Sequence, residues 1–312
     1  MHFPKSSIVL LAAASSVQAL SFNDVSTAAS ILKREASGLG NNLLSLVRRQ
    51  DGCPAVWNDV ASELRGWFLD GEGCSDDARA AIRLAFHDCF AGGCDGSIIL
   101  AKEYTREENA GLENFSVKLA PLAEQYDVGT ADLVQFAGAQ AIATCPLGPR
   151  VAVKVGRADN DIPSEAGQLP SATASASTLI GQFEAKGFSS TDLIALVGAH
   201  STAKQFFAKP EKAGLSMDST PGTWDTKFYT QTSLGTAPVS LDSDVNLSKD
   251  LRTIVQWSSF SSQAVWSAAF VSAFNKMSVL GNDAGSLTDC TNVINAATSK
   301  RDIKAAPIAD RM

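Results

Sequence analysis

The chain has few histidines. Its 312 residues include three, His2, His87 and His200, and His2 lies in the N-terminal leader. Two histidines cannot complete a zinc site, or the two-histidine site of non-haem iron, without other good ligands. A lone histidine on an apolar helix face is most often a satisfied core residue, which is the alternative to any catalytic role.

Long apolar runs are also missing. The run at residues 8–14 is far shorter than the roughly 20 residues of a membrane span, and no later stretch reaches that length. Lys5 precedes this run and small residues follow it up to Ala19, a pattern typical of a secretory signal peptide. We therefore expect a signal peptide at 1–19 and a soluble, exported, extracellular protein.

Two dibasic pairs, Lys33-Arg34 and Arg48-Arg49, precede the first cysteine. They favour a propeptide at 20–49, and a solvated arm with ordinary surface charges is the alternative. Removal of residues 1–49 leaves 21 Lys and Arg against 31 Asp and Glu, a formal net charge of −10. This acidic balance argues against nucleic acid and anionic membranes as partners. We expect a monomer.

The chain shows no alternation of strand and helix patterns, which argues against a Rossmann or barrel architecture. Helical periodicity dominates instead, so the sequence predicts a mainly α protein. Ser75 can cap a helix that contains His87, and Ser190 or Thr191 can cap one that ends near His200. Further helical patterns begin near Trp57, Thr130 and Ser262.

One sequence pattern occurs twice. "TADLVQFAGAQ" ends at Gln140, and the similar "STDLIALVGAH" ends at His200, 60 residues later. The repetition suggests two related helical hairpins. Only the second copy offers a metal ligand, because glutamine is a poor one.

The six cysteines are an even number in an exported chain, so disulfides are the default interpretation. Composition cannot choose among fifteen possible pairings. Cys89 and Cys94 can close a small loop on "CFAGGC", where small residues permit a tight path. A zinc site is the competing interpretation of this pair, but it lacks free partners.

The stretch "RLAFHDCFAGGCDGS", residues 83–97, concentrates reactive side chains. On a helix, Arg83 and His87 lie one turn apart on one face, and Asp88 points about 100° away. His87 and Cys89 do not face each other, and there is no G-x-S-x-G elbow, which argues against nucleophilic catalysis. Haem iron needs one protein ligand, which would leave the second histidine free as an acid and base.

Several motifs resemble those of a known family. "RLAFHDC", "GCDGS" and "LVGAHS" are similar to the signatures of the plant-type haem peroxidase superfamily. The leader and "MDSTPGTWDTKFY" resemble its secreted fungal class II branch. The resemblance extends from Cys53 to Ile294. It implies a domain at 50–312 with haem b between a distal half, about 50–160, and a proximal half, about 161–300.

The resemblance also implies roles for individual residues. His87 would be the distal acid and base, Arg83 the distal arginine and Phe86 the aromatic shield of the haem. Asn109 would orient the distal histidine, and Glu103 would hold this asparagine. His200 would be the iron ligand, and Asp244 would be the carboxylate bonded to that ligand.

Two calcium ions follow from the same resemblance. Oxygen side chains, backbone carbonyls and glycine-permitted turns suit such a hard cation. Asp88 would face a distal calcium ion instead of the haem. The distal ligands would be Asp88, Gly93 through its carbonyl, Asp95 and Ser97. The proximal ligands would be Ser201, Asp218, Thr220, Thr223 and Asp225.

The resemblance further implies the disulfides Cys53–Cys290, Cys74–Cys145 and Cys89–Cys94. The first two are similar to the fungal branch and the third to the plant secretory branch. Asn114 and Asn246 begin acceptor sequons for N-glycosylation. Asn114 is expected in a loop and is the favoured glycosylation site, because Asn246 lies two residues from the expected position of buried Asp244.

The sequence departs from the family at sites that select substrates. Manganese peroxidases bind Mn²⁺ through three carboxylates, and the matching positions here are Asp76, Ala80 and Phe206. Lignin peroxidases carry a surface tryptophan where this chain has Ala195. At the position near the proximal histidine where the family usually has an aromatic residue, this chain has Met217.

These features predict a secreted haem peroxidase. It would use hydrogen peroxide for one-electron oxidation of small phenolic or aromatic donors through a ferryl intermediate. A tryptophan route, for instance through Trp224, is a further hypothesis. The alternative is a secreted calcium- and haem-binding protein that has the peroxidase fold but little catalysis.

Overall fold

The computed structural model describes residues 52–71 and 73–294, which belong to one compact unit. The predicted signal peptide at 1–19 and propeptide at 20–49 lie outside these residues. Helices dominate the described chain, as the sequence predicts, and strands are few and short. The protein is thus mainly α.

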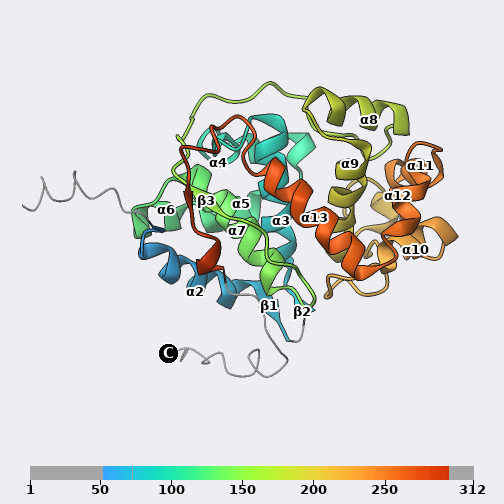
Figure 1. The fold of residues 1–312 in the computed structure, drawn as a ribbon, viewed down its shortest axis with the longest axis horizontal. Coiled ribbons are helices and arrows are strands. Elements are labelled where there is room, and N and C mark those ends of the chain that lie inside the picture. Colours follow the sequence, from blue (N-terminus) through green and yellow to red (C-terminus); the bar gives the residue numbers. More distant parts are fainter. Residues whose placement is uncertain (1–51, 72, 295–312) are drawn as a thin grey trace, which may run out of the picture. The chain divides into compact units, whose positions relative to one another are not determined.

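The first group of helices carries His87. Its longest members are α2, α3 and α7, and α3 packs against both of the others. Figure 1 shows this group in blue to green. Its helices are α2 (Val56–Phe68), α3 (Asp76–Ala91), α4 (Ser97–Leu100), α5 (Glu113–Leu119), α6 (Pro121–Tyr126) and α7 (Thr130–Thr144), with the 3₁₀ turns η1 (Glu103–Thr105) and η2 (Glu107–Asn109).

The second group carries His200. Helix α13 (Gln263–Met277) packs against α9 of this group and also against α3 of the first, so it joins the two (Figure 1). The other members are α8 (Ala176–Ala185), α9 (Ser190–Val197), η3 (Gly198–Thr202), η4 (Pro210–Lys212), α10 (Lys227–Leu234), α11 (Asp242–Lys249) and α12 (Ile254–Ser259).

Two small antiparallel sheets complete the fold. Strand β1 (Leu69–Asp70) pairs with β2 (Gly73–Cys74), and β3 (Lys154–Val155) pairs with β4 (Thr288–Asp289), before the last turn η5 (Thr291–Val293). The second sheet brings the C-terminal segment back to the first group of helices. Cys53–Cys290 fastens the same region, with Cα atoms 4.8 Å apart.

The contact between α3 and α7 is close because of one glycine. All residues of α7 are buried. A Cβ atom on Gly138 would lie 2.5 Å from the Cβ of Ala85 on α3, so a larger residue would force the helices apart. This packing fixes the helix that carries Arg83 and His87.

Helix starts largely follow the sequence. Ser75 caps α3 by accepting a hydrogen bond from Ala78 N at 3.1 Å, as expected. The expected cap of α9 is wrong: the cap is Ser189, not Ser190 or Thr191. Ser189 Oγ accepts from Asp192 N, and the Asp192 carboxylate accepts from Ser189 N, so this reciprocal pair sets the first turn.

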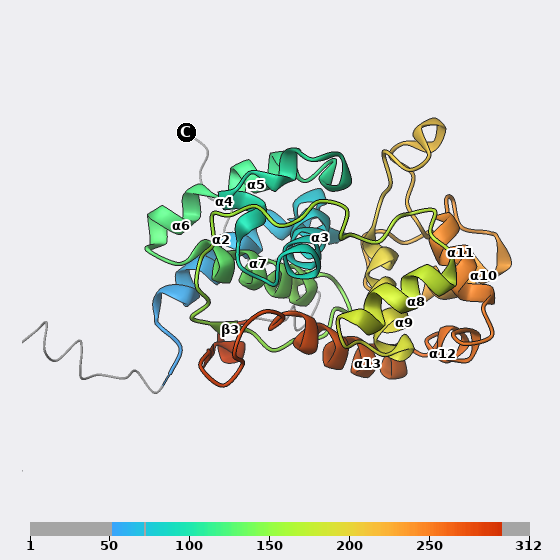
Figure 2. The ribbon, with the colours of Figure 1, turned by 90° about the horizontal axis from the view of Figure 1, so that it is seen from above.

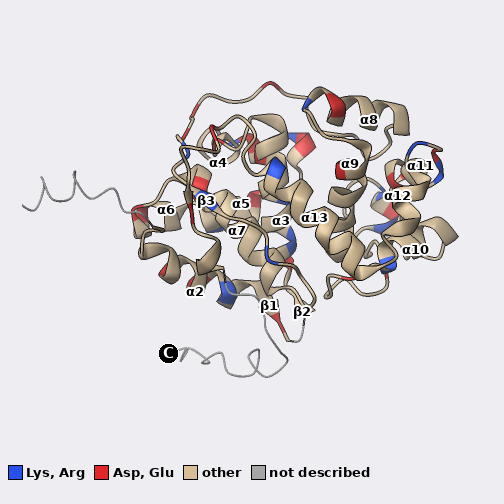
Figure 3. Ribbon diagram, in the orientation of Figure 1, with Lys and Arg blue, Asp and Glu red and all other residues tan. Residues whose placement is uncertain are grey.

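Three disulfides join the described cysteines: Cys53–Cys290, Cys74–Cys145 and Cys89–Cys94, the pairs that the family resemblance implies. Lys and Arg are interspersed with Asp and Glu along the ribbon (Figure 3). Within the described ranges, no helix has the length and apolar character needed to cross a membrane.

Candidate active site

His87 lies on α3 with both ring nitrogens engaged. Arg83, one turn earlier, donates from Nε to His87 Nε2 at 3.1 Å. His87 Nδ1 lies 2.6 Å from Asn109 Oδ1, which can only accept. The ring is therefore the Nδ1–H tautomer, and Nε2 is its basic atom.

The His87 imidazole is neutral. Burial lowers its pKa to about 3, with help from the Arg83 cation and against the opposing hydrogen bond of Asn109. His87 can therefore accept a proton at neutral or mildly acidic pH.

Arg83 is held at an open part of the surface. Its Nη1 donates to Ala110 O at 2.8 Å and its Nη2 to Glu108 O at 3.4 Å. With the bond from Nε to His87, all three side-chain nitrogens have a hydrogen-bond acceptor. Although the side chain is exposed, the protein around it desolvates the guanidinium and lowers its pKa to about 10. Arg83 remains a cation at neutral pH.

Asn109 is oriented from the 3₁₀ turns η1 and η2. Its Nδ2 donates to the backbone carbonyl of Glu103 at 2.8 Å. The Glu103 carboxylate has a different partner: it accepts from Ser164 N at 2.5 Å and Ser164 Oγ at 2.8 Å. No sequence pattern indicated Ser164, because 61 residues separate it from Glu103.

Phe86 precedes His87 and belongs to an aromatic group. Its ring stacks on Phe90 at 5.0 Å between centroids and on Phe183 of α8 at 6.3 Å, and its edge meets His87 at 5.9 Å. Phe86 remains partly accessible. Packed aromatic rings therefore line one side of His87.

His200 lies in the 3₁₀ turn η3, directly after α9 ends at Val197. Its Nδ1 is 3.1 Å from Asp244 Oδ2, and Asp244 is buried. Phe228 approaches the ring edge-on at 5.6 Å. Met217, at the position where an aromatic residue was expected, is buried.

The residues fit a haem group. No described residue hydrogen-bonds to His200 Nε2, and a third of the His200 side chain is exposed, so this nitrogen is free to bind iron. The buried carboxylate of Asp244 accepts from Nδ1–H of His200. This bond leaves Nε2 without a proton and orients the ring so that Nε2 faces away from Asp244. The other histidine, His87, presents a base next to a cation, which is what peroxide chemistry requires.

The expected distal calcium ligands lie together between the last turns of α3, which contain Asp88, and the start of α4, which is Ser97. Burial, and next the neighbouring Asp95, raise the pKa of Asp88 to about 7. Asp88 Oδ1 and Ser97 Oγ are buried without a hydrogen-bond partner. Unpaired buried oxygens are costly, so this donor set fits a calcium ion.

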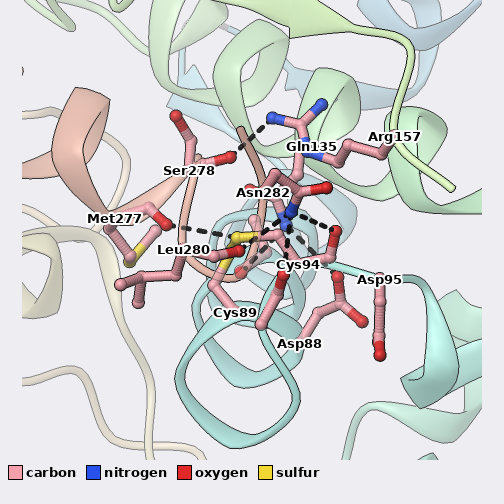
Figure 4. Close-up of a disulfide and its surroundings, with 12 residues drawn as sticks. Asp88, Cys89, Cys94, Asp95, Gln135, Arg157, Met277, Ser278, Leu280 and Asn282 are labelled. Atoms are coloured by element: carbon pink, nitrogen blue, oxygen red, sulfur yellow. Dashed lines mark hydrogen bonds between the residues drawn. A yellow bond between two sulfur atoms is a disulfide. The ribbon is translucent and has the colours of Figure 1, made fainter. Parts of the chain in front are cut away.

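Around this loop, Asn282 Nδ2 donates to the carbonyl of Gly93, a predicted ligand, at 2.9 Å. Figure 4 shows Asn282 beside the Cys89–Cys94 disulfide. This bond uses one of the two lone pairs of the carbonyl. Asn160 Nδ2 holds Asp95 Oδ2 at 2.8 Å. Both asparagines support the loop, and the sequence alone did not reveal either.

Among the expected proximal calcium ligands, Ser201 lies in η3, and the other four precede α10. Thr220 N donates to Asp218 Oδ1 at 2.7 Å, and Thr220 Oγ1 donates to Asp225 Oδ2 at 2.8 Å. Burial raises the pKa of Asp218 to about 6. Asp218 Oδ2 and Ser201 Oγ are buried without a partner. Thr223 N donates to Thr220 O at 2.9 Å.

The position that matches a manganese ligand is occupied by an ion-pair cluster. Asp76 Oδ1 accepts from Arg79 at 2.7 Å and from Lys204 at 3.0 Å. Burial is the largest single influence and raises the pKa of Asp76, but the hydrogen bonds and charges of Lys204 and Arg79 together outweigh it and hold the pKa below its usual value. In the described part of the chain, no group of three or more His, Cys, Asp or Glu could hold a metal ion. The two calcium sets contain two carboxylates each and do not depend on such a group.

One expected environment is wrong. Asn114 lies in helix α5, not in a loop, although its side chain is exposed. Asn246 is exposed on α11, and its Nδ2 donates to Ala174 O at 3.0 Å. Exposure therefore does not separate the two sequons.

Comparisons with known proteins agree with the geometry. The family model described as Peroxidase matches residues 60–263. Manganese peroxidase 3 of Phlebia radiata is 31% identical, with 88% of this chain and 86% of that protein covered. A peroxidase of Arthromyces ramosus is 32% identical, covering 81% and 78%. Ligninase B of Phanerodontia chrysosporium is 30% identical, covering 88% and 82%.

The helical fold and the two histidine sites are those of a haem-dependent oxidoreductase. The chain belongs to the plant-type haem peroxidase superfamily. Haem and calcium are typical of this family.

Proposed function

We propose that the protein is a secreted enzyme that uses hydrogen peroxide to remove single electrons from small phenolic and other small aromatic donors. The observation that carries this proposal is the arrangement of Arg83, His87 and Asn109. Together they hold a neutral imidazole with its basic Nε2 beside a cation. The three disulfides support export into an oxidising compartment.

The proton transfers belong to His87. Its Nε2 takes a proton from one peroxide oxygen and returns it to the oxygen that departs as water. Arg83 stabilises the negative charge that develops as the O–O bond breaks. Asn109 keeps the Nδ1–H tautomer, so Nε2 is the ring nitrogen that lacks a proton and can accept one.

His200 would hold haem b through Nε2. When bound, the haem supplies an iron centre that accepts oxidising equivalents from peroxide and passes them on one electron at a time. Asp244 accepts the Nδ1–H of His200 and makes this ligand more basic. We propose two structural calcium ions at the distal and proximal ligand sets.

The choice of donor follows from the positions that differ from the relatives. Mn²⁺ needs several converging carboxylates, but Ala80 and Phe206 supply none, and Lys204 and Arg79 already pair with Asp76. Ala195 is fully buried and cannot act as a surface radical relay. Small phenols that reach the site directly are the donors that remain.

The test has two stages. The purified holoprotein should show a Soret band that shifts when peroxide is added, and a band that does not respond would favour a haem-binding protein with little catalysis. Phenol, Mn²⁺ and a non-phenolic aromatic should then be compared at acidic pH. Saturable Mn²⁺ oxidation as fast as phenol oxidation would overturn the choice of donor.

A further inference from the structure

The loop from Lys204 to Ser216 exposes an unusual amount of apolar surface. Phe206 is 49% exposed, Phe207 is 58% exposed and Leu215 is 42% exposed. The rings of Phe206 and Phe207 lie 6.3 Å apart between centroids. Two neighbouring exposed phenylalanines exceed the scattered single residues expected on a soluble protein.

This loop has a fixed shape. A bridge between Lys204 and Ser216 closes it. Gln205, which is buried inside it, accepts from Lys209 N at 3.0 Å and donates to the carbonyls of Lys209 at 2.9 Å and Lys212 at 2.6 Å. The exposed rings are thus presented by a well-bonded scaffold, which lowers the entropy cost of binding to them.

The loop reaches the catalytic residues. An ideal Cβ on Gly111 would lie 2.8 Å from Phe207 Cε2 and 3.8 Å from Arg83 Nη1. The Phe207 ring therefore packs on the turn whose Ala110 carbonyl accepts from Arg83. Figure 2 shows the loop, in gold, projecting on the same side of the molecule as α5. A residue that follows His200 by seven positions thus touches the segment that holds the distal arginine.

The charges near the rings favour an uncharged ligand. Lys204 pairs with Asp76 at 3.0 Å, and Lys209 pairs with Asp242 at 2.9 Å, so two of the loop's three lysines are compensated. An aromatic face binds another ring by offset or edge-to-face contact. The matching ligand is a neutral ring with an apolar substituent.

We infer that Phe206 and Phe207 form a binding subsite for uncharged, alkyl-substituted phenols at the rim of the active site. This inference rests on the proposed function, because it assigns the ring contacts of the donor. The two phenylalanines set KM for such donors and take no part in the reaction with peroxide.

The experiment uses the holoenzyme and its Phe207→Ala, Phe206→Ala and double variants. The donors are 4-tert-butylphenol and ferrocyanide, a one-electron donor without a ring. The double variant should raise KM for the phenol about 3- to 10-fold, the effect of losing one or two ring contacts. Its KM for ferrocyanide, which offers no ring to contact, should stay unchanged. Phe207→Tyr should behave as the parent, and Leu251→Ala, which removes an exposed side chain elsewhere, should have no effect.

Saturation-transfer NMR with 4-tert-butylphenol and the resting enzyme gives a readout independent of turnover. Signal that is lost in the double variant supports the subsite even if phenols prove to be poor donors, which separates this inference from the proposed function. An unchanged KM and NMR signal in the double variant would overturn it. So would equal changes for phenol and ferrocyanide, or a change of oligomeric state that shows the rings to be an interface between copies.

Discussion

The two histidines of this protein occupy opposite situations. His87 is buried, with hydrogen bonds at both ring nitrogens. His200 has a buried carboxylate on Nδ1 and no described hydrogen-bond partner on Nε2, and a third of its side chain is exposed. A histidine whose two nitrogens are oriented within the protein is prepared for proton transfer. One whose second nitrogen is free is prepared to bind a group that the chain itself does not supply.

The contrast predicts that His200→Ala loses its cofactor. With Nε2 removed, no described histidine on the same group of helices could replace it, so the variant should contain little haem. Haem content by pyridine haemochrome and the Soret spectrum measure this. Asp244→Asn is the matched control, because it keeps the iron ligand and should retain more haem. Normal haem content with an unchanged spectrum in His200→Ala would refute the ligand assignment.

His87→Ala should show the opposite behaviour, with haem retained and chemistry lost. Its reaction with peroxide should slow by about 10²- to 10⁴-fold, the usual range for lost general acid–base catalysis. Stopped-flow absorbance of the haem band after mixing with peroxide measures the rate. If this rate equals that of the parent enzyme, His87 has no part in the mechanism.

Arg83→Leu should reduce the same rate less than His87→Ala. The loss should be on the order of 10²-fold, because Arg83 stabilises charge but does not carry the proton. Arg83 also donates to the carbonyls of Ala110 and Glu108, so Arg83→Leu removes these bonds as well as the positive charge. Arg83→Lys keeps the charge and is the control. A larger loss in Arg83→Leu than in His87→Ala would reverse the assigned roles.

Removal of calcium should affect both histidines together. Asp88 follows His87 and Ser201 follows His200, so chelation should disturb haem geometry as well as stability. A site saturated at 100 times its Kd contributes about 2.7 kcal/mol, which corresponds to a fall in Tm on the order of 5 °C for each ion. Calorimetry with and without chelator, followed by calcium add-back, tests this. An unchanged Tm and activity would exclude structural calcium.

Glycosylation should have the smallest effect. Asn114 should be occupied in preference to Asn246, whose amide is already bonded to the Ala174 carbonyl. Because Asn114 is exposed, Asn114→Gln should change stability by less than about 0.5 kcal/mol. Peptide mapping measures occupancy, and a glycan found at Asn246 alone would contradict this order.

The fold class could be predicted, and the catalytic residues could be proposed, because both depend on local patterns. Helical periodicity indicated α3 and α7, and the resemblance identified Arg83, His87 and His200 from contiguous motifs. The cap of α9 was misplaced because Ser189, Ser190 and Thr191 are locally equivalent, and only the reciprocal bonds with Asp192 select the first.

The repeated pattern shows where local information ends. "TADLVQFAGAQ" continues as one helix to Thr144, whereas "STDLIALVGAH" leaves the α-helix after Val197 and turns through η3. The matching glycines meet different neighbours: Gly138 faces Ala85, and Gly198 faces the Trp266 and Tyr229 side chains. The turn that carries His200 therefore differs from its counterpart in its tertiary packing. The segment itself does not encode this packing. The contact between Phe207 and Gly111 was missed for the same reason.

The disulfide that joins the ends of the described chain has a consequence for biosynthesis. Cys53 and Cys290 are 237 residues apart, so the first cysteine to be made must wait for the last. Closing a loop of that size lowers the entropy of the unfolded chain by an amount worth about 5 kcal/mol. Until Cys290 has been synthesised, Cys53 can react with any of four other cysteines. Two of these, Cys89 and Cys94, pair with each other in the folded protein. Correct maturation thus depends on thiol–disulfide exchange that keeps the earliest thiol available until synthesis is almost complete.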